Sequence, residues 1–130
     1  MYLQKHQSKY HNVRQQYGGY AYASKKEANR AFELDMLLRA KEIKSWKKQI
    51  TLPLYFKDIK VCDYRIDFIK YELTGDIVLE EVKGFATDSW RYKRNMLDAI
   101  LSYPKSSEYK KIARVIGAKK NQEIKYEVLQ

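Results

Sequence analysis

Apolar positions along this chain recur with two different spacings, which divide it into expected helices and strands. Between residues 24 and 41, Ala31, Leu34 and Leu38 fall on one stripe, which Phe32 widens, as on the buried side of an amphipathic helix. The stretch starts with a capping-box pattern, Ser24-Lys25-Lys26-Glu27. We therefore predict a helix that opens at Ser24 and runs to about residue 41.

Two later segments, residues 59–70 and 77–83, carry apolar side chains on both faces. This pattern is typical of strands in the middle of a sheet that is covered on each side. The turn Leu73-Thr74-Gly75-Asp76 separates them and predicts a hairpin. Further strands are expected at residues 51–56, 112–117 and 124–129.

Thr87-Asp88 is expected to cap a second helix over residues 89–102, which Tyr103-Pro104 closes. The order of elements is then helix, strands, helix, strands, which predicts an α/β sandwich. A chain of 130 residues is expected to form one domain. We assign it to residues 20–130, and residues 1–19, polar and basic up to Gly18-Gly19, to a flexible N-terminal arm.

Composition limits the cellular compartment and the class of partner that we expect. No apolar run approaches the roughly 20 residues that a membrane span needs, and no signal peptide is evident, so we expect no membrane partner. The single cysteine, Cys62, excludes an internal disulfide and suits a reducing cytoplasm, that of a bacterium or a phage-infected host. A net charge of +10 and 12 tyrosines favour nucleic acid as the partner.

Acidic side chains inside the two hairpin strands are the candidate chemistry. Glu81 and Lys83 are two apart on one strand and share a face, whereas Glu80 points to the other. A two-residue loop would leave Asp67 one position away from Glu81. A three-residue loop, Leu73-Thr74-Gly75, would set Asp67 directly opposite Glu81, close enough for both carboxylates to hold one hard cation. Lys83 would then stand beside the ion and position an attacking water.

Each of these acids also has an ordinary structural interpretation. Asp67 could pair with Arg65 or Lys83 at a solvated sheet edge, and Glu80-Glu81 could be a plain acidic dipeptide. Glu27 lies on the apolar stripe of the first helix and is the third candidate acid, although a capping box also places glutamate there.

The second helix presents a basic, aromatic face that could grip phosphates beside the acids, or could be partly core and partly solvated. Lys25 and Lys26, at the start of the first helix, are similar candidates. The nucleic-acid-binding candidates are Lys25, Lys26, Trp90, Arg91, Lys93 and Arg94.

Across residues 19–100 the sequence resembles the PD-(D/E)XK nuclease superfamily, and within it small phage endonucleases of the Holliday-junction-resolvase type. The matching positions are Ser24, Glu27, Gln49, Tyr64, Asp67, Phe68 and the run Glu81-Val82-Lys83-Gly84. Ile66 stands where many members of the superfamily have proline before the aspartate. The resemblance implies a restriction-endonuclease-like mixed sheet, flanked by helices on both faces, and metal-dependent phosphodiester hydrolysis.

The resemblance also assigns roles. Asp67 and Glu81 would bind Mg²⁺, for which Mn²⁺ could substitute, and the carbonyl of Val82 would add a ligand. Glu27 would bind the metal directly or through water, Lys83 would assist the nucleophilic water, and Gln49 would support the site. The expected substrate is branched DNA such as a four-way junction, which a homodimer would cut on two strands. A nicking or flap-type nuclease with the same residues, and a non-catalytic DNA-binding module, are the alternatives.

Overall fold

A computed structural model describes residues 14–130, and the expected arm therefore lies outside the described residues up to position 13. The rest of that arm is not a tail, because residues on either side of Gly18-Gly19 form a strand pair, β1 with β2. The elements are β1 (Gln15–Tyr17), β2 (Tyr20–Tyr22), α1 (Lys25–Arg39), β3 (Ile43–Phe56), β4 (Ile59–Glu72), β5 (Ile77–Val82), α2 (Asp88–Leu101), α3 (Ser107–Ile116) and β6 (Ile124–Leu129).

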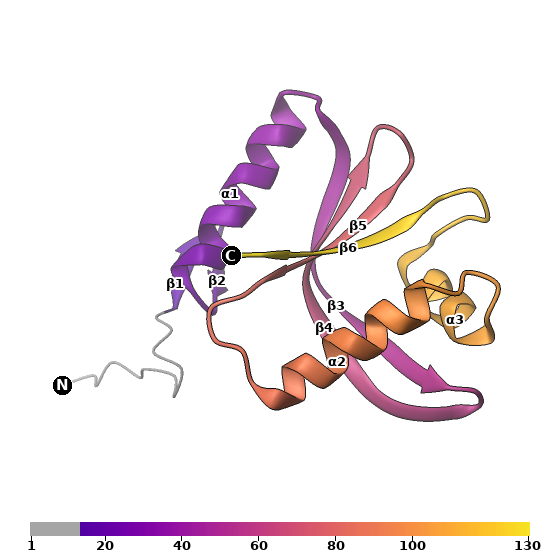
Figure 1. Cartoon of the computed structure of the whole chain (residues 1–130). Coiled ribbons are helices and arrows are strands. Elements are labelled where there is room, and N and C mark those ends of the chain that lie inside the picture. Colours follow the sequence, from indigo (N-terminus) through magenta and orange to yellow (C-terminus); the bar gives the residue numbers. More distant parts are fainter. Residues whose placement is uncertain (1–13) are drawn as a thin grey trace.

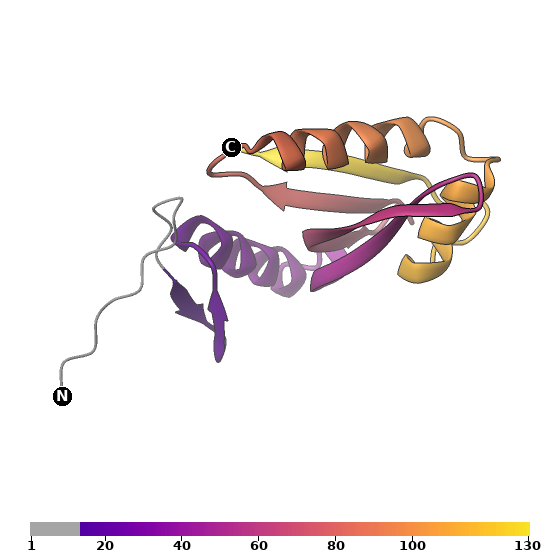
Figure 2. The ribbon, with the colours of Figure 1, turned by 90° about the horizontal axis from the view of Figure 1, so that it is seen from below.

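A mixed sheet with helices on both faces organises the molecule, which confirms the predicted α/β fold. The sheet has four strands in the order β3-β4-β5-β6. The first three run antiparallel to their neighbours, and β6 joins β5 in parallel. In Figure 1 the helices flank the sheet, and Figure 2 shows α1 on one face and α2 on the other.

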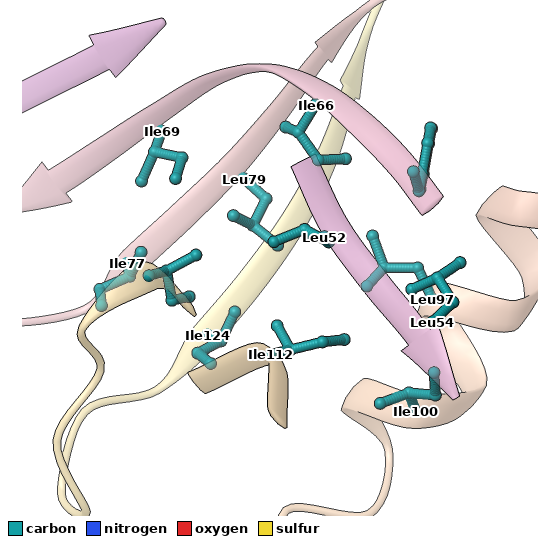
Figure 3. Close-up of a cluster of buried hydrophobic side chains, with 12 residues drawn as sticks. Leu52, Leu54, Ile66, Ile69, Ile77, Leu79, Leu97, Ile100, Ile112 and Ile124 are labelled. Carbon is teal, nitrogen blue, oxygen red and sulfur yellow. The ribbon is translucent and has the colours of Figure 1, made fainter. Parts of the chain in front are cut away.

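Two hydrophobic clusters hold these layers together. The larger fills the space between the sheet and helices α2 and α3 (Figure 3) and includes Leu79, Leu97 and Ile112, none of which is exposed. The smaller lies under α1, where Phe68 of β4 meets Leu34 and Tyr22. Because the central strands β4 and β5 face both clusters, they carry apolar residues on both sides, as their sequence predicted.

At one level of the sheet, the side chains of β3 and β4 switch from one face of the sheet to the other. Ile66 and Ile69 are three apart on β4 and yet both belong to the larger cluster, while Phe68 lies in the smaller one. Strict alternation would place Ile66 and Phe68 on the same face. On β3 the matching level is Gln49, which has a φ of 50° between the register pairs on either side of it. This distortion occurs beside Asp67, where the candidate acids meet.

Three details of the sequence-based assignment are wrong. The strand expected at residues 51–56 starts already at Ile43. Residues 112–117, expected to be a strand, belong to α3, which starts after Ser106 and ends at Gly117. Phe32 and Leu38, expected on the buried stripe of α1, are 51% and 39% exposed. Within residues 14–130, no helix combines the length and the apolar character that crossing a membrane requires.

Candidate functional site: clustered carboxylates at the end of the sheet

The hairpin between β4 and β5 has the register that sets Asp67 opposite Glu81. Its closing hydrogen bond runs from the N–H of Glu72 to the carbonyl of Asp76, at 2.9 Å, leaving a three-residue loop. Gly75 in that loop has a φ of 96°, which glycine adopts without strain. The last register pair is Phe68 with Glu80, so the next position on each strand brings Asp67 level with Glu81. The three-residue loop is confirmed, and the two-residue alternative is wrong.

Asp67 is the centre of the acidic cluster. Its Oδ2 accepts a hydrogen bond from the backbone N–H of Val82 at 2.8 Å. The carboxyl groups of Glu81, on β5, and of Glu27, in the first turn of α1, each lie near enough to that of Asp67 for its charge to raise their pKa values. Elements far apart in the sequence therefore bring three carboxyl groups together.

Burial and mutual repulsion make these carboxylates costly to ionise. Burial, and then the charge of Asp67, raise the pKa of Glu81 to about 9. The same two causes raise the pKa of Glu27 to about 7. Burial also raises the pKa of Asp67, although the N–H of Val82 opposes this by stabilising the charged form. Glu81 is only 8% exposed, and its Oε2 is buried without a hydrogen-bond partner in the described structure. A solvated sheet edge is therefore the wrong description of these residues.

Lys83 supplies a positive charge beside Asp67 and Glu81. Its Nζ lies 4.4 Å from the ring centroid of Trp90 on α2. Its charge opposes the rise in pKa at both Asp67 and Glu81. The ammonium group is thus held beside the carboxylates and against an aromatic face.

Glu80, next to Glu81, points to the other face of the sheet, as predicted, and serves a different purpose. Its side chain is fully buried and binds Arg30 of α1 through two hydrogen bonds, of 2.8 Å from Nε and 2.6 Å from a terminal nitrogen. Lys70 adds a longer ion pair of 3.6 Å. This pairing fixes α1 on the sheet, and with it the position of Glu27.

The main chain of β5 adds an oxygen to the site. The N–H of Lys83 donates to the carbonyl of Leu129 on β6, at 2.9 Å. The described peptide bonds are all trans, so the carbonyl of Val82 points away from β6 and toward β4, the side on which Asp67 lies. The carbonyl of Val82 can therefore face the carboxylates, as its predicted role as a metal ligand requires.

These donors suit a hydrated divalent ion better than a closed cage. Between residues 14 and 130, no group of three or more His, Cys, Asp or Glu side chains is arranged to hold a metal ion. Mg²⁺ in proteins typically keeps several waters and takes one or two carboxylates. Asp67 and Glu81, with the Val82 carbonyl, match that demand, and the partnerless oxygen of Glu81 is the atom that most needs a cation.

Gln49 lies level with Asp67 on the neighbouring strand, between the pairs Lys48–Phe68 and Ile50–Ile66. Among the described residues, no hydrogen bond joins its side chain to any of the three carboxyl groups. Its visible contribution is the left-handed backbone at which β3 changes face. Sequence reasoning placed Gln49 beside the site without detecting this conformation.

A hollow of about 270 Å³ opens beside Glu81. Thr87, Ser89, Trp90 and Lys93, from the start of α2, form one wall, and Arg65 contributes from β4. The N-terminus of a helix and two cationic side chains favour an anion, so a phosphate group placed here would face the carboxylates. Arg65 was missed as a functional candidate, although its place two residues before Asp67 on a strand was the available clue.

None of the other basic candidates lines this hollow, and Lys26 borders a different one beside α1. Arg91 is exposed and pairs with Asp88 at 2.9 Å, while Lys25 and Lys26 are exposed at the start of α1. The guanidinium of Arg94 lies 4.9 Å from the ring centroid of Trp90. Lys83 and Arg94 both contact the half-buried ring of Trp90, so this ring packs against side chains of the protein itself.

Comparison with known proteins identifies a family without naming an activity. Residues 7–126 match the family described as "Protein of unknown function (DUF1064)", and the chain belongs to this family. No curated protein and no solved structure matches it.

Proposed function

We propose that this member of the DUF1064 family is a Mg²⁺-dependent endonuclease that hydrolyses phosphodiester bonds in DNA. The observation that carries the proposal is the buried, partnerless oxygen of Glu81 beside Asp67. A protein gains nothing in stability from two adjacent buried carboxylates, and a divalent cation is the partner that makes them favourable. The sequence resemblance to the PD-(D/E)XK superfamily supports the same assignment.

In this proposal some residues of the site hold the metal ion, and others hold the phosphate group. Mg²⁺, or Mn²⁺ in its place, would polarise the phosphate and lower the pKa of a bound water. Asp67, Glu81 and the carbonyl of Val82 would hold the ion, and Glu27 would contact it directly or through a water. Lys83 orients the attacking water and stabilises the charge that develops on the phosphate. Arg65, Lys93 and the start of α2 hold the phosphate in the hollow beside Glu81.

Branched DNA is the proposed substrate, in the cytosol of a bacterium or a phage-infected host. The net charge of +10 supports a nucleic-acid partner, and the preference for a four-way junction rests on the resemblance alone. One chain has one such site, so cutting two symmetric strands of a junction requires a homodimer.

Substitutions that keep side-chain shape test the enzyme directly. Asp67→Asn and Lys83→Met should each lower the rate of cleavage by at least about a hundredfold, because they remove charge at the reacting centre. Glu42→Gln is the matched control, since it removes one charge from an exposed residue between α1 and β3. Each protein is incubated with a four-way junction, a flap and a linear duplex, in Mg²⁺ and in a chelator. Unchanged cutting by both site variants would reject the assigned residues.

A non-catalytic DNA-binding module is the second candidate, favoured by the lack of a three-ligand metal cage in the described structure. In that case the wild-type protein would bind all three DNAs and cut none in Mg²⁺ or Mn²⁺. Preferential cutting of the flap, with the junction left intact, would instead select the flap-type nuclease.

A further inference from the structure

A hollow near the far end of α2 is separate from the carboxylate site. It encloses about 840 Å³ and is formed by the segment after α2, by α3 and by the turn before β6. Figure 1 shows α3 beyond the C-terminal end of α2. The carboxylate site lies at the opposite, N-terminal end of that helix. A volume of this size is typical of sites that take a small organic ligand.

The rim of this hollow is cationic and free of acidic side chains. The charged residues that line it are Lys105, Lys110, Arg114, Lys119 and Lys120. Within residues 14–130, none of these side chains takes part in an ion pair. Their charge is therefore available to an anionic ligand, and repulsion between them falls when such a ligand binds.

The floor of the hollow is apolar and firmly held. Tyr109, Ala113 and Ala118 line it and also pack against the larger hydrophobic cluster. The turn before β6 is fixed by Gln122, whose side chain accepts from the N–H of Lys119 at 2.7 Å and donates to the carbonyl of Gly75 at 2.9 Å. The site is thus preformed, with a flat apolar base and a charged rim.

We propose that this hollow binds an unpaired segment of a nucleic-acid strand, with a base on the apolar floor and phosphates on the cationic rim. A positively charged groove beside an aromatic ring is the arrangement that single-strand binding requires. The chemistry fits an unpaired strand better than a duplex, because only an unpaired base has a free face to stack on the ring of Tyr109.

This step rests on the proposed function. Taken together with the carboxylate site, the hollow specifies the structure of the DNA substrate more closely. The 14 residues of α2 separate the two sites, and a helix of that length spans about 20 Å. This distance corresponds to about six nucleotide steps at the 3.4 Å spacing of one strand of B-form DNA. The expected substrate is DNA with an unpaired strand about six nucleotides from the scissile phosphate.

Binding of a short single strand, measured without cleavage, tests the inference. The probe is a fluorescein-labelled oligothymidylate of about six nucleotides, followed by fluorescence anisotropy in chelator. Arg114→Ala/Lys119→Ala should weaken binding about tenfold and make the slope of log affinity against log salt concentration shallower by about 1.4. Arg39→Ala/Lys44→Ala, with the same loss of charge on exposed residues elsewhere, should change the affinity less than twofold. Equal losses in the two variants would overturn the inference.

A second variant separates the hollow from charge alone. Ala113→Phe leaves the net charge unchanged and fills the floor, so it should weaken binding of the oligonucleotide several-fold while circular dichroism stays native. Undiminished binding by folded Ala113→Phe would show that no base enters the hollow. Displacement of the probe by thymidine monophosphate at an equal nucleotide concentration would also overturn the proposal, in favour of a free nucleotide.

The two proposals can fail separately. Asp67→Asn should bind the oligonucleotide as the wild type does, because the hollow lies away from the carboxylates. If Asp67→Asn and Lys83→Met still cut DNA, the nuclease assignment is wrong and the binding result stands. If the rim variants bind normally while Mg²⁺-dependent cutting depends on Asp67, only the hollow has been misassigned.

Discussion

Glu81 is the residue at which stability and the proposed chemistry oppose each other. Its carboxylate is buried beside Asp67, and one of its oxygens lacks a hydrogen-bond partner in the described structure. Ionising a group in that state costs free energy, so the metal-free protein keeps this carboxyl group protonated up to a pH of about 9. A bound ligand that replaces the interactions with water lost on burial best explains why a glutamate stands at this position.

The stability of the metal-free protein should fall as pH rises. The pKa values of Glu27 and Glu81 are raised in the folded protein, to about 7 and about 9, so folding favours their protonated forms. Their stabilising contribution is complete below the unfolded value of 4.5 and is lost as pH rises through 7 toward 9. The shift at Glu27 alone corresponds to roughly 3 kcal/mol. Urea unfolding in chelator, at several pH values, measures this loss.

Mg²⁺ should reverse that loss, with an effect that grows with pH because the ion binds the ionised acids. Glu81→Gln is the informative control, since it keeps the shape of the side chain and removes its titration. The variant should show a shallower dependence on pH and little stabilisation by Mg²⁺. A slope identical to that of the wild type would assign the pH dependence to other groups.

At the scale of elements, the ion pair between Arg30 and Glu80 fastens α1 to β5. Glu80 is fully buried and the Arg30 side chain is 17% exposed, so removal of either partner leaves a buried charge. Arg30→Ala should destabilise the protein by about 3–5 kcal/mol, as measured by urea unfolding. Arg30→Met/Glu80→Met should recover most of that loss, because apolar side chains of similar size replace the pair. A small effect of Arg30→Ala alone would contradict the role assigned to this contact.

The loop that sets the hairpin register depends on one glycine. Gly75 has a φ of 96°, and an added Cβ would meet no atom within 4 Å. Gly75→Ala should therefore destabilise the protein through the backbone alone, by about 1 kcal/mol, while cleavage per folded molecule stays unchanged. Thermal unfolding and the junction assay measure the two effects. A loss of cleavage beyond the loss of folded protein would mean that the register itself had shifted.

Elements with a local sequence pattern could be predicted, and those that depend on distant contacts could not. The position of Asp67 opposite Glu81 followed from the loop length and Gly75, because hairpin register is a local property. The helix at residues 107–116 was missed because the short run Ile112-Ala113-Arg114-Val115-Ile116 is rich in β-branched apolar residues, which strands also favour. Ser106 and Gly117, which cap that helix, were the overlooked indications.

The candidate site divides in the same way. The carboxylates and Lys83 stand in short motifs with recognisable spacing, whereas Arg30 and Glu80 are 50 positions apart and join only in the folded protein. The left-handed backbone of Gln49 has no sequence marker, since glutamine is not a residue that favours it. Partners of buried charges and strained backbone positions therefore had to come from the structure.

At the scale of the whole molecule, basic side chains lie beside both ends of α2. Arg65 and Lys93 line the hollow next to Glu81, and five other basic residues rim the hollow at α3. A surface charged in this way should bind duplex DNA with a strong dependence on salt.

Binding of a duplex in chelator should weaken with a slope of about −4 in log affinity against log salt concentration, if roughly five phosphates are contacted. Arg91→Ala/Lys93→Ala should make this slope shallower by about 2. The measurement is fluorescence anisotropy of a labelled duplex at several salt concentrations. A slope near zero in the wild type would exclude phosphate contacts as the main source of affinity.

The separation of the two acids of β5 onto opposite faces also has an evolutionary consequence. Glu80 holds the architecture together, whereas Glu81 weakens it, so the two neighbours are under selection for different reasons. Under the proposed function, replacement of Glu81 would be free to spread in a lineage that no longer needs to cut DNA, because it relieves the fold. Inactive descendants should therefore be recognisable by an uncharged residue at position 81 next to an intact Arg30 and Glu80.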